Sequence, residues 1–532
     1  MRSNIMHHIY QRIASRPRSI LNHRLSAENW LFLSIAALFV LWTAVPLFSN
    51  YAVGLDAIEM HSWSLAPQWG YYKHPPLPAW VIALSEFLFG KTKFALVLPS
   101  TISIAITYWA IWHLAKKILL PHLAVVATFL STTCLYYQLW AVSFNHNVIQ
   151  IPLWAWCITL FYQASHSTRV RDWVALGITF GLALLAKYTA VLLLPPALLF
   201  LFLTPNARHN LRLLALLSGA LATALVVGPH LAWLVEHDFQ AFNYVSARLA
   251  EHSGSFSWLK GFASFIGTAL AAHSVMLLVL GLRGGFAKQT IATMAKKIDN
   301  MCAFNTHRHI VHMPQTYNEP EKKRFLLLFG LGPFLLALLV GFSGKTLSPM
   351  WDIAMVPLSG MLLVYWKPIY ASRLYQRRWL AFWLIFQLLL ASLFLMKDSA
   401  TYYRFARLSA RAAYPAKILV STVATPWQTK FPEQKLHYVA GHIWEAGIVS
   451  FYHPDTPHVL VDGDFSTAPW IKKEQVYHCG MVLLSPTQAM LTSFPTAQIQ
   501  APLTIPAVAR GLPNKILHWA VIAPQKTGCS DR

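Results

Sequence analysis

Repeated apolar runs of about membrane length fill the first 400 residues of the chain and leave few folds open to it. A helix needs about 20 mostly apolar residues to cross a bilayer. Only 12% of the residues are charged, against about 25% in soluble domains. We therefore expect a mainly α-helical membrane protein with about eleven transmembrane helices, near 27–49, 92–115, 119–138, 146–164, 172–186, 188–203, 211–234, 262–283, 325–342, 352–366 and 379–396.

The basic residues predict how these helices are oriented. A formal net charge of +23 would suggest nucleic acid as the partner of a soluble protein, but here the basic residues flank apolar runs. Lys and Arg concentrate in cytoplasmic loops, and anionic lipids attract them. With a cytoplasmic N-terminus, nearly all basic clusters fall on one side: 1–26, 116–117, 169–171, 208–212, 284–324 and 367–378. This pattern predicts membrane lipids rather than nucleic acid as partners, with the loop 50–91 and the C-terminal part outside.

After residue 398 the apolar runs become short and alternate with polar residues. Four of them are predicted strands: 437–440, 459–461, 481–484 and 518–522. We therefore expect two domains, a transmembrane domain over 1–398 and a small soluble α/β domain over 399–532. Cys479 and Cys529 both lie in the second domain. A disulfide, if that domain is exported, and two free thiols are equally open.

The first outer loop, residues 50–91, carries the strongest candidates for catalysis. Asp56 and Glu59 are spaced i, i+3, so they would share one face of a helix. Transfer of a sugar to a hydroxyl group needs a base near the acceptor oxygen, and a carboxylate suits that role. The alternative is two solvated loop carboxylates, or one acid that caps a helix. The sequence leaves the two interpretations about level.

Basic residues near the outer surface are candidates for binding an anionic phosphate leaving group. Lys73 and His74 lie in the first loop, Lys187 lies between the fifth and sixth apolar segments, and Lys345 lies in the short outer loop 343–351. Most basic residues of this chain are expected on the cytoplasmic side, so a Lys on the outer side favours a functional role for that residue. Each of them could instead reach up to lipid phosphate.

Tyr72, Asn145 and His146 are the candidates for contact with a sugar or acceptor. Tyr72 and its neighbour Tyr71 could stack on a sugar ring, or belong to the belt of aromatic residues found at membrane surfaces. Asn145 and His146 lie in the next outer loop, where capping of the following helix is the stronger interpretation of Asn145.

The two prolines after His74 predict where the next helix begins. Pro75-Pro76 suits a helix start. The apolar stretch 77–89 that follows would be about 20 Å long as a helix, which is too short to cross a membrane. We expect it to lie on the outer surface and to hold residues 71–74 at the height of lipid headgroups.

The chain contains neither a GxxxxGK[ST] nor a GxGxxG phosphate-binding loop. Its five Cys residues show no metal-ligand spacing. We therefore expect no cofactor and no supported metal site. A donor carried by a membrane lipid and used from outside is favoured over a nucleotide sugar from the cytosol.

The segment Gly70-Tyr71-Tyr72-Lys73-His74-Pro75-Pro76-Leu77, followed by Trp80, carries a family resemblance. With the acids before it, it resembles the first outer loop of the GT-C membrane glycosyltransferases. The similar branch contains bacterial aminoarabinose and galacturonosyl transferases of lipid A and protein mannosyltransferases. The segment 342–355 resembles a later motif of one bacterial subgroup. Aminoarabinose transferases carry Glu-Lys before the prolines, where this chain has Lys73-His74.

This resemblance implies an inverting enzyme in the bacterial inner membrane with a periplasmic C-terminal domain. It would transfer a sugar from an undecaprenyl-phosphate donor to lipid A, lipopolysaccharide, another glycan or protein. Asp56 would be the catalytic base and Glu59 accessory, while Tyr71, Lys73 and His74 would hold the donor phosphate. A lipid or small-molecule transporter is the alternative, but transporters usually place polar groups at mid-membrane. A non-catalytic binding protein of the same fold is a third reading.

Overall fold

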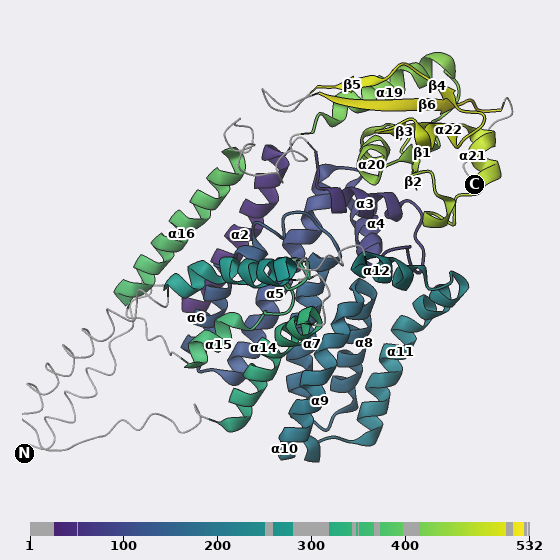
Figure 1. Ribbon diagram of the computed structural model, residues 1–532. Coiled ribbons are helices and arrows are strands. Elements are labelled where there is room, and N and C mark those ends of the chain that lie inside the picture. The colour runs from purple at the N-terminus through teal and green to yellow at the C-terminus, as the bar shows by residue number, and fades with distance from the viewer. Residues whose placement is uncertain are drawn as a thin grey trace, which may run out of the picture.

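The computed structural model describes residues 26–50, 52–250, 259–279, 319–342, 347–348, 350–366, 373–396, 414–506, 514–525 and 529. Within these residues the chain is mainly helical, with a small sheet near its C-terminal end (Figure 1). Lys345, the arm 1–25 and most of the basic loop 284–324 lie outside the described residues.

Five helices of the described part are long and apolar enough to cross a membrane: α2 (Ala27–Ser49), α5 (Lys93–Ile118), α11 (Leu213–Glu236), the helix Leu259–Val279 and α14 (Pro320–Phe342). The other helices of this part are α6 (Pro121–Ser131), η1 (Leu135–Tyr137), α7 (His146–Ser165), α8 (Val170–Ala186), η2 (Tyr188–Leu193), α9 (Leu194–Leu203), α10 (Pro205–His209), α12 (Gln240–Ala250), α15 (Ser359–Trp366) and α16 (Arg373–Leu395). A mainly helical protein with apolar spans is therefore confirmed, whereas the number eleven is not.

Central and peripheral helices differ in how their apolar residues are used. In α5, 72% of the 18-residue apolar stretch is buried inside the protein, whereas in α11 only 28% of the corresponding stretch is buried. Leu214, Leu217, Leu221 and Leu225 of α11 are all exposed. Their spacing of three to four residues places them on one stripe of the helix. We infer that α5 packs at the centre and that this stripe of α11 faces lipid.

The helical path is broken at Lys187, between the fifth and sixth predicted segments. Helix α8 ends at Ala186, and Lys187 has an extended backbone (φ −167°, ψ 139°). The chain continues as the 3₁₀-helix η2 and then as α9, which has Pro in its first turn. Such a break frees backbone and side-chain groups at a helix end to contact other parts of the chain.

Two short helices form the first outer loop, α3 (Leu55–Ser64) and α4 (Leu77–Phe89). Helix α4 begins directly after Pro76, as the two prolines predicted. The only charge of α4, Glu86, turns toward α3, where it accepts a hydrogen bond from Ser64 Oγ (2.8 Å) and contacts His61 Nδ1 (2.7 Å). Between the two helices, a Cβ at Gly70 would clash with the ring of Trp233 in α11. The loop is thus fixed both internally and against the helical bundle.

The C-terminal part contains a six-stranded mixed sheet made of β1 (Tyr438–Gly441), β2 (His458–Val461), β3 (Met481–Ser485), β4 (Gln498–Ile499), β5 (Leu503–Ile505) and β6 (Lys515–Ile522). The strand order is β2-β1-β3-β6-β4, and β5 also pairs with β6. β1 runs parallel to β2 and β3, whereas β6 is antiparallel to β3. The accompanying helices are α19 (Ala416–Lys430), α20 (Ile443–Tyr452), η5 (Phe465–Thr467), α21 (Lys473–Cys479) and α22 (Ala489–Thr492). All four predicted strands are present.

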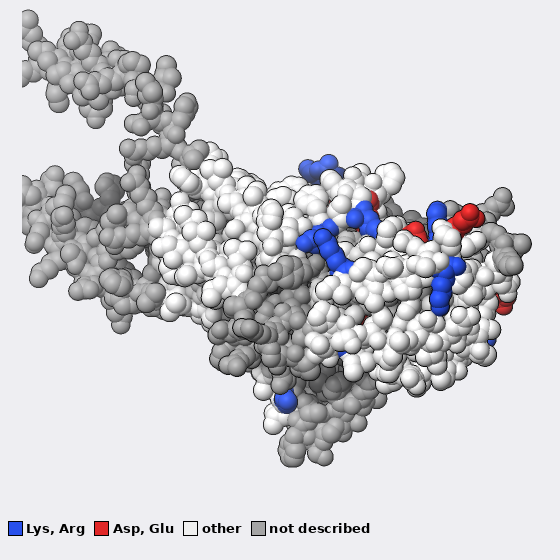
Figure 2. Space-filling view, turned by 90° about the horizontal axis from the view of Figure 1, so that it is seen from above, with Lys and Arg blue, Asp and Glu red and all other residues white. Residues whose placement is uncertain are grey.

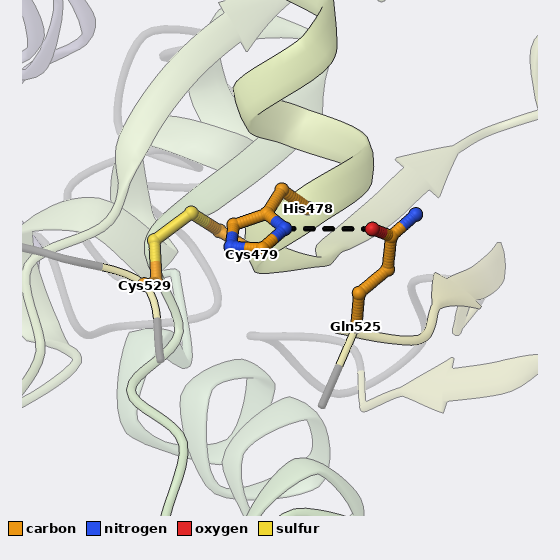
Figure 3. Close-up of a disulfide and its surroundings, with 4 residues drawn as sticks. All are labelled: His478, Cys479, Gln525 and Cys529. Atoms are coloured by element: carbon orange, nitrogen blue, oxygen red, sulfur yellow. Dashed lines mark hydrogen bonds between the residues drawn. A yellow bond between two sulfur atoms is a disulfide. The ribbon is translucent and has the colours of Figure 1, made fainter. Parts of the chain in front are cut away.

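Cys479 and Cys529 form a disulfide, which decides between the two alternatives left open by the sequence (Figure 3). It joins the last residue of α21 to the C-terminal tail, with 5.3 Å between the two Cα atoms. Next to it, Gln525 Oε1 lies 3.4 Å from His478 Nδ1. The tail is therefore held to α21 at two neighbouring points.

The sheet lies at one end of the helices, above α3 and α4 (Figure 1). Helix α20 packs directly on α3, because Gly447 has no side chain where a Cβ would clash with Cγ2 of Ile58. Ser450 Oγ of α20 also lies 3.4 Å from His61 Nε2 of α3. Seen from above, the visible charged side chains on this end are few and scattered (Figure 2). Lys91 Nζ, at the end of the first loop, also donates a hydrogen bond of 2.6 Å to the carbonyl of His453, so the contact combines close packing with hydrogen bonds.

Candidate functional site

Asp56 lies in the first turn of α3, where the partial positive charge of a helix N-terminus favours a carboxylate. Its Oδ2 accepts a hydrogen bond of 2.9 Å from Nδ2 of Asn145. The same Asn145 caps α7, because its Oδ1 accepts from the backbone N–H groups of Asn147 (2.8 Å) and Val148 (3.1 Å). The predicted capping role of Asn145 is therefore confirmed, and the cap also positions Asp56, which remains partly exposed.

Glu59, one helical turn after Asp56, is paired with Lys73. Lys73 Nζ lies 2.7 Å from Glu59 Oε1, and it also lies above the rings of Tyr72 (5.1 Å) and Tyr244 (5.6 Å). Burial raises the pKa of Glu59, which is 7% exposed, and Lys73 opposes that rise. Burial alone would lower the pKa of Lys73, but Glu59 and Tyr72 raise it above its ordinary value. The lysine therefore stays charged beside the acid.

Lys187 reaches the same region from the break after α8. Its Nζ donates a hydrogen bond of 2.7 Å to Asn147 Oδ1 and lies 5.3 Å from the ring of Trp351. Burial lowers the pKa of Lys187 to about 7, and the charge of Asp56 opposes that fall. A bound phosphate would favour the charged form of the amine, and an ammonium group in this position is suited to bind an anion.

The rings of His74 and His146 are in contact, with 3.8 Å between their centroids and 33° between their planes. Burial, with Lys187 and Lys73 nearby, lowers the pKa of His74 to about 3. The ring is therefore neutral at physiological pH and offers hydrogen bonds rather than charge. Two buried polar atoms, Nδ1 of His146 in this pair and Oγ of Ser143 near Gly54, have no hydrogen-bond partner among the described residues. Such atoms usually find a partner in water or a ligand.

Tyr71 lies apart from this cluster although it belongs to the same motif. It is fully buried, stacks on Trp63 at 4.7 Å, and donates its hydroxyl proton to the Trp63 carbonyl (3.0 Å). Its hydroxyl also accepts from the backbone N–H of Gln68 (3.2 Å). Tyr72, by contrast, is partly exposed and close to Lys73. Tyr71 thus shapes the loop from inside.

The fold brings together eight of the predicted site residues: Asp56, Glu59, Tyr72, Lys73, His74, Asn145, His146 and Lys187. They come from α3, the loop before α4, the start of α7 and the end of α8. Asn147 and Tyr244 join them without having been predicted as site residues. Asn147 belongs to the triplet Asn145-His146-Asn147, which the sequence marks as a possible sugar contact or helix cap, whereas no sequence signal singles out Tyr244. In the described part of the chain, no three His, Cys, Asp or Glu side chains gather as a metal site would need.

Residues 73–233 match the family model described as dolichyl-phosphate-mannose-protein mannosyltransferase. The lipid A galacturonosyltransferase RgtD of Rhizobium johnstonii is 28% identical over 205 residues, which are 38% of this chain and 42% of that protein. The undecaprenyl phosphate-alpha-4-amino-4-deoxy-L-arabinose arabinosyl transferase of Pseudomonas savastanoi is 26% identical over 202 residues, 36% of this chain and 37% of the relative. The matched region thus spans about two-fifths of these relatives.

The crystal structure of ArnT from Cupriavidus metallidurans bound to undecaprenyl phosphate has a similar fold. The TM-score is 0.59 at 14% identity, and the match covers 94% of this chain and 100% of that one. At this identity the likeness concerns the fold alone. Together with the family match, it confirms the expected resemblance to the GT-C membrane glycosyltransferases.

Proposed function

We propose that this chain, with its GT-C fold and first-loop motif, is a membrane glycosyltransferase that uses a polyprenyl-phosphate-linked sugar. The acceptor would be lipid A, lipopolysaccharide or another envelope glycan. The observation that carries the proposal is the arrangement at the start of α7: Asn145 binds the partly exposed carboxylate of Asp56 at a helix N-terminus, and Asn147 binds the buried amine of Lys187. The family model described as dolichyl-phosphate-mannose-protein mannosyltransferase matches residues 73–233, which contain Lys73, His74 and Lys187.

In the proposed reaction, Asp56 removes the proton from an acceptor hydroxyl group. The acceptor oxygen forms a bond to the anomeric carbon, and the bond from that carbon to the donor phosphate oxygen breaks. Polyprenyl phosphate leaves with the electron pair, stabilised by the ammonium group of Lys187. A single displacement of this kind inverts the anomeric centre, for a hexose or a pentose alike. Preorganised positive groups that stabilise the developing charge on a leaving group are usually the largest single contribution to such a rate enhancement.

The remaining residues would support these two. Lys73 would keep Glu59 charged and assist at the phosphate, and the neutral ring of His74 would donate a hydrogen bond to it. The unpartnered His146 Nδ1 and the partly exposed Tyr72 would contact the sugar. Asn145 would orient Asp56, and Tyr71 would hold the loop rather than touch the donor. Lys345 remains a predicted phosphate ligand.

We further propose that α3, α4 and the C-terminal domain face the periplasm, with the N-terminus in the cytoplasm and eleven membrane crossings. Lys117, His166 and Arg169 gather around one surface pocket. This pocket lies at the start of α8, whereas Lys187 and the first loop lie at the end of that helix. The basic residues of the pocket are therefore far from the C-terminal domain. Disulfides such as Cys479–Cys529 persist in oxidising compartments like the periplasm. Both observations support this orientation, and we propose a boundary between the two domains near residue 398.

Reporter fusions test the orientation directly. A reporter fused after residue 366 is expected in the cytoplasm and one fused after residue 396 in the periplasm, because α16 would cross the membrane between them. Alkaline phosphatase, which needs disulfides, should be active only in the second fusion. A fluorescent protein that folds only in the cytoplasm should fluoresce only in the first fusion. Equal results for the two positions would contradict the proposed number of crossings.

Donor binding is tested with undecaprenyl phosphate and the purified protein in nanodiscs. Lys187→Met is expected to weaken its binding at least tenfold, because a charge-assisted hydrogen bond to phosphate contributes about 1.5–3 kcal/mol. Lys260→Met, which removes an exposed lysine from the helix Leu259–Val279, is the matched control and should bind as the wild type does. Unchanged affinity in Lys187→Met would remove Lys187 from the donor site, and no binding by the wild type would contradict the proposed donor class.

A further inference from the structure

Two residues of the C-terminal domain lie side by side at one edge of its sheet. His442 follows β1, and Asp462 follows the parallel strand β2. The backbone N–H of Asp462 donates a hydrogen bond of 2.8 Å to the carbonyl of Gly441, which holds the two turns together. In open α/β sheets, ligands bind outside the carboxyl ends of parallel strands. These two side chains therefore occupy the edge at which such sheets place their ligand contacts.

This edge is turned toward the first loop of the membrane domain. Helix α20 starts directly after His442 and packs on α3, the helix that carries Asp56 and Glu59. A second contact, between the rings of Trp470 and Tyr71 at 5.6 Å, joins the domain to the loop that carries Lys73. These two contacts hold the carboxyl edge of the sheet against the first loop.

Electrostatics agrees with this placement. Burial raises the pKa of Asp462, and His442 and Lys73 oppose that rise. His442 also opposes the rise that burial causes in the pKa of Glu59. Each of the two C-terminal residues is therefore close to one member of the Glu59–Lys73 pair.

His442 and Asp462 are exposed to water, whereas the charged side chains of Glu59 and Lys73 are mostly buried. The side chain of His442 is 48% exposed, and Asp462 is exposed. Lys73 retains 19% exposure beneath them. His442 is steadied by Glu445, 3.2 Å from its Nδ1, and Glu445 in turn pairs with Lys515. The Glu59–Lys73 pair thus lies between a buried side with Lys187 and a water-facing side with His442 and Asp462.

We propose that His442 and Asp462 form the acceptor subsite, where they bind the sugar headgroup of a glycolipid acceptor and direct one hydroxyl group toward Asp56. This inference rests on the proposed glycosyltransferase function. The donor phosphate belongs on the buried side, near Lys187 and the membrane helices, so the acceptor is left the water-facing side. A carboxylate accepts hydrogen bonds from two neighbouring hydroxyl groups, and an imidazole can donate or accept one. This pair suits hydroxyl-rich sugars.

The matched pair of variants is Asp462→Asn and Asp464→Asn in the full-length protein. Asp462 has a positive φ of 50°, a conformation that Asn also tolerates, so the first substitution keeps the turn. Asp464 belongs to the same turn, but its carboxylate binds Ser466 within the turn (2.9 Å to the backbone N–H). Asp464→Asn is therefore the control for a change of charge in this turn.

The test measures binding of two probes, lipid A and undecaprenyl phosphate, to the protein in nanodiscs. Asp462→Asn and His442→Ala are expected to weaken lipid A binding at least tenfold and to change undecaprenyl phosphate binding less than twofold. Asp464→Asn should change neither. Retained binding of undecaprenyl phosphate excludes misfolding of the membrane domain as the cause, and an unchanged unfolding temperature excludes misfolding of the C-terminal domain.

The outcomes separate this inference from the function on which it rests. If the wild type fails to bind undecaprenyl phosphate, the proposed function is overturned. If the wild type binds both probes and Asp462→Asn binds lipid A equally well, or loses both probes to the same extent, the acceptor subsite is overturned. Binding of undecaprenyl phosphate but not lipid A by the wild type overturns a glycolipid headgroup as the ligand of this edge and points to a protein or another acceptor.

Discussion

Replacing Asp56 with asparagine is expected to lower sugar transfer by about a thousandfold, within the 10²–10⁴ range attributed to a positioned general base. The amide cannot accept the proton of the acceptor hydroxyl. Its oxygen can still accept the hydrogen bond from Asn145 Nδ2, so the geometry of α3 and α7 should persist. Transfer is measured by mass spectrometry of lipid A and other envelope glycans from cells that carry each variant.

Asp172→Asn is the matched control for this loss. Asp172 also accepts a hydrogen bond from a side-chain amide, that of Gln163 at 3.0 Å, although it is buried where Asp56 is partly exposed. It lies at the start of α8, whereas Lys187 and the site lie at the end of that helix. It should therefore transfer sugar at the normal rate. An Asp56→Asn protein that is folded, binds undecaprenyl phosphate and still transfers sugar at the wild-type rate would show that another group is the base.

Much of the local structure could be predicted because it depends on neighbouring residues. Pro75-Pro76 fixed the start of α4, since proline suits the first turn of a helix and disrupts its interior. Alternation of apolar and polar residues located the four predicted strands. Asn145 was predicted as a cap from its residue type, and the structure adds its contact with Asp56. In each case a few adjacent residues determine the conformation.

The contacts that complete the site could not be predicted, because they join distant parts of the chain. Tyr71 belongs to the family-like motif, yet its partner is the Trp63 carbonyl inside the loop. Asn147 meets Lys187 only because α7 and α8 are antiparallel neighbours. Tyr244 reaches Lys73 from α12, a helix that no motif marks. Sequence spacing predicts which residues share a face, whereas the partner of that face follows from the packing of whole helices.

The position of His442 and Asp462 illustrates how far a general rule could have gone. The predicted strands 437–440 and 459–461 end next to these residues, and parallel strands place their carboxyl ends at one edge. This rule about parallel strands could have identified the edge of the sheet that carries the two residues. It could not have predicted that this edge faces the first loop. That direction depends on α20 packing against α3, where Gly447 lies directly over Ile58. Shape complementarity between two segments of this kind leaves no recognisable signal in a single sequence.

The second large effect is expected at the Glu59–Lys73 pair. Lys73→Met leaves the buried carboxylate of Glu59 without its ammonium partner. Breaking a buried ion pair in this way destabilises a protein by about 3–5 kcal/mol, and because Lys73 is 19% exposed we expect the lower end, about 3 kcal/mol. The rate of sugar transfer from the donor should fall as well. Stability is measured by thermal unfolding of the protein in detergent, with the variants compared at the same pH.

The pH dependence of this loss follows from the direction of the Glu59 pKa. Burial raises that pKa above its ordinary value of 4.5, and loss of Lys73 removes the main opposing influence. A carboxyl group with a raised pKa binds more protons in the folded state, so its contribution to stability is greatest at low pH and is lost as the pH rises through the folded-state pKa. The deficit of Lys73→Met should therefore shrink between pH 8 and pH 5.

The double variant Glu59→Gln with Lys73→Met separates stability from function. It removes both charges, so most of the lost stability should return, and the difference from the sum of the two single variants measures their interaction. Transfer should not return if Lys73 also acts at the donor phosphate. Full recovery of transfer together with stability would limit Lys73 to keeping Glu59 in place, and Lys187 would then be the sole lysine among the described site residues left to act on the phosphate.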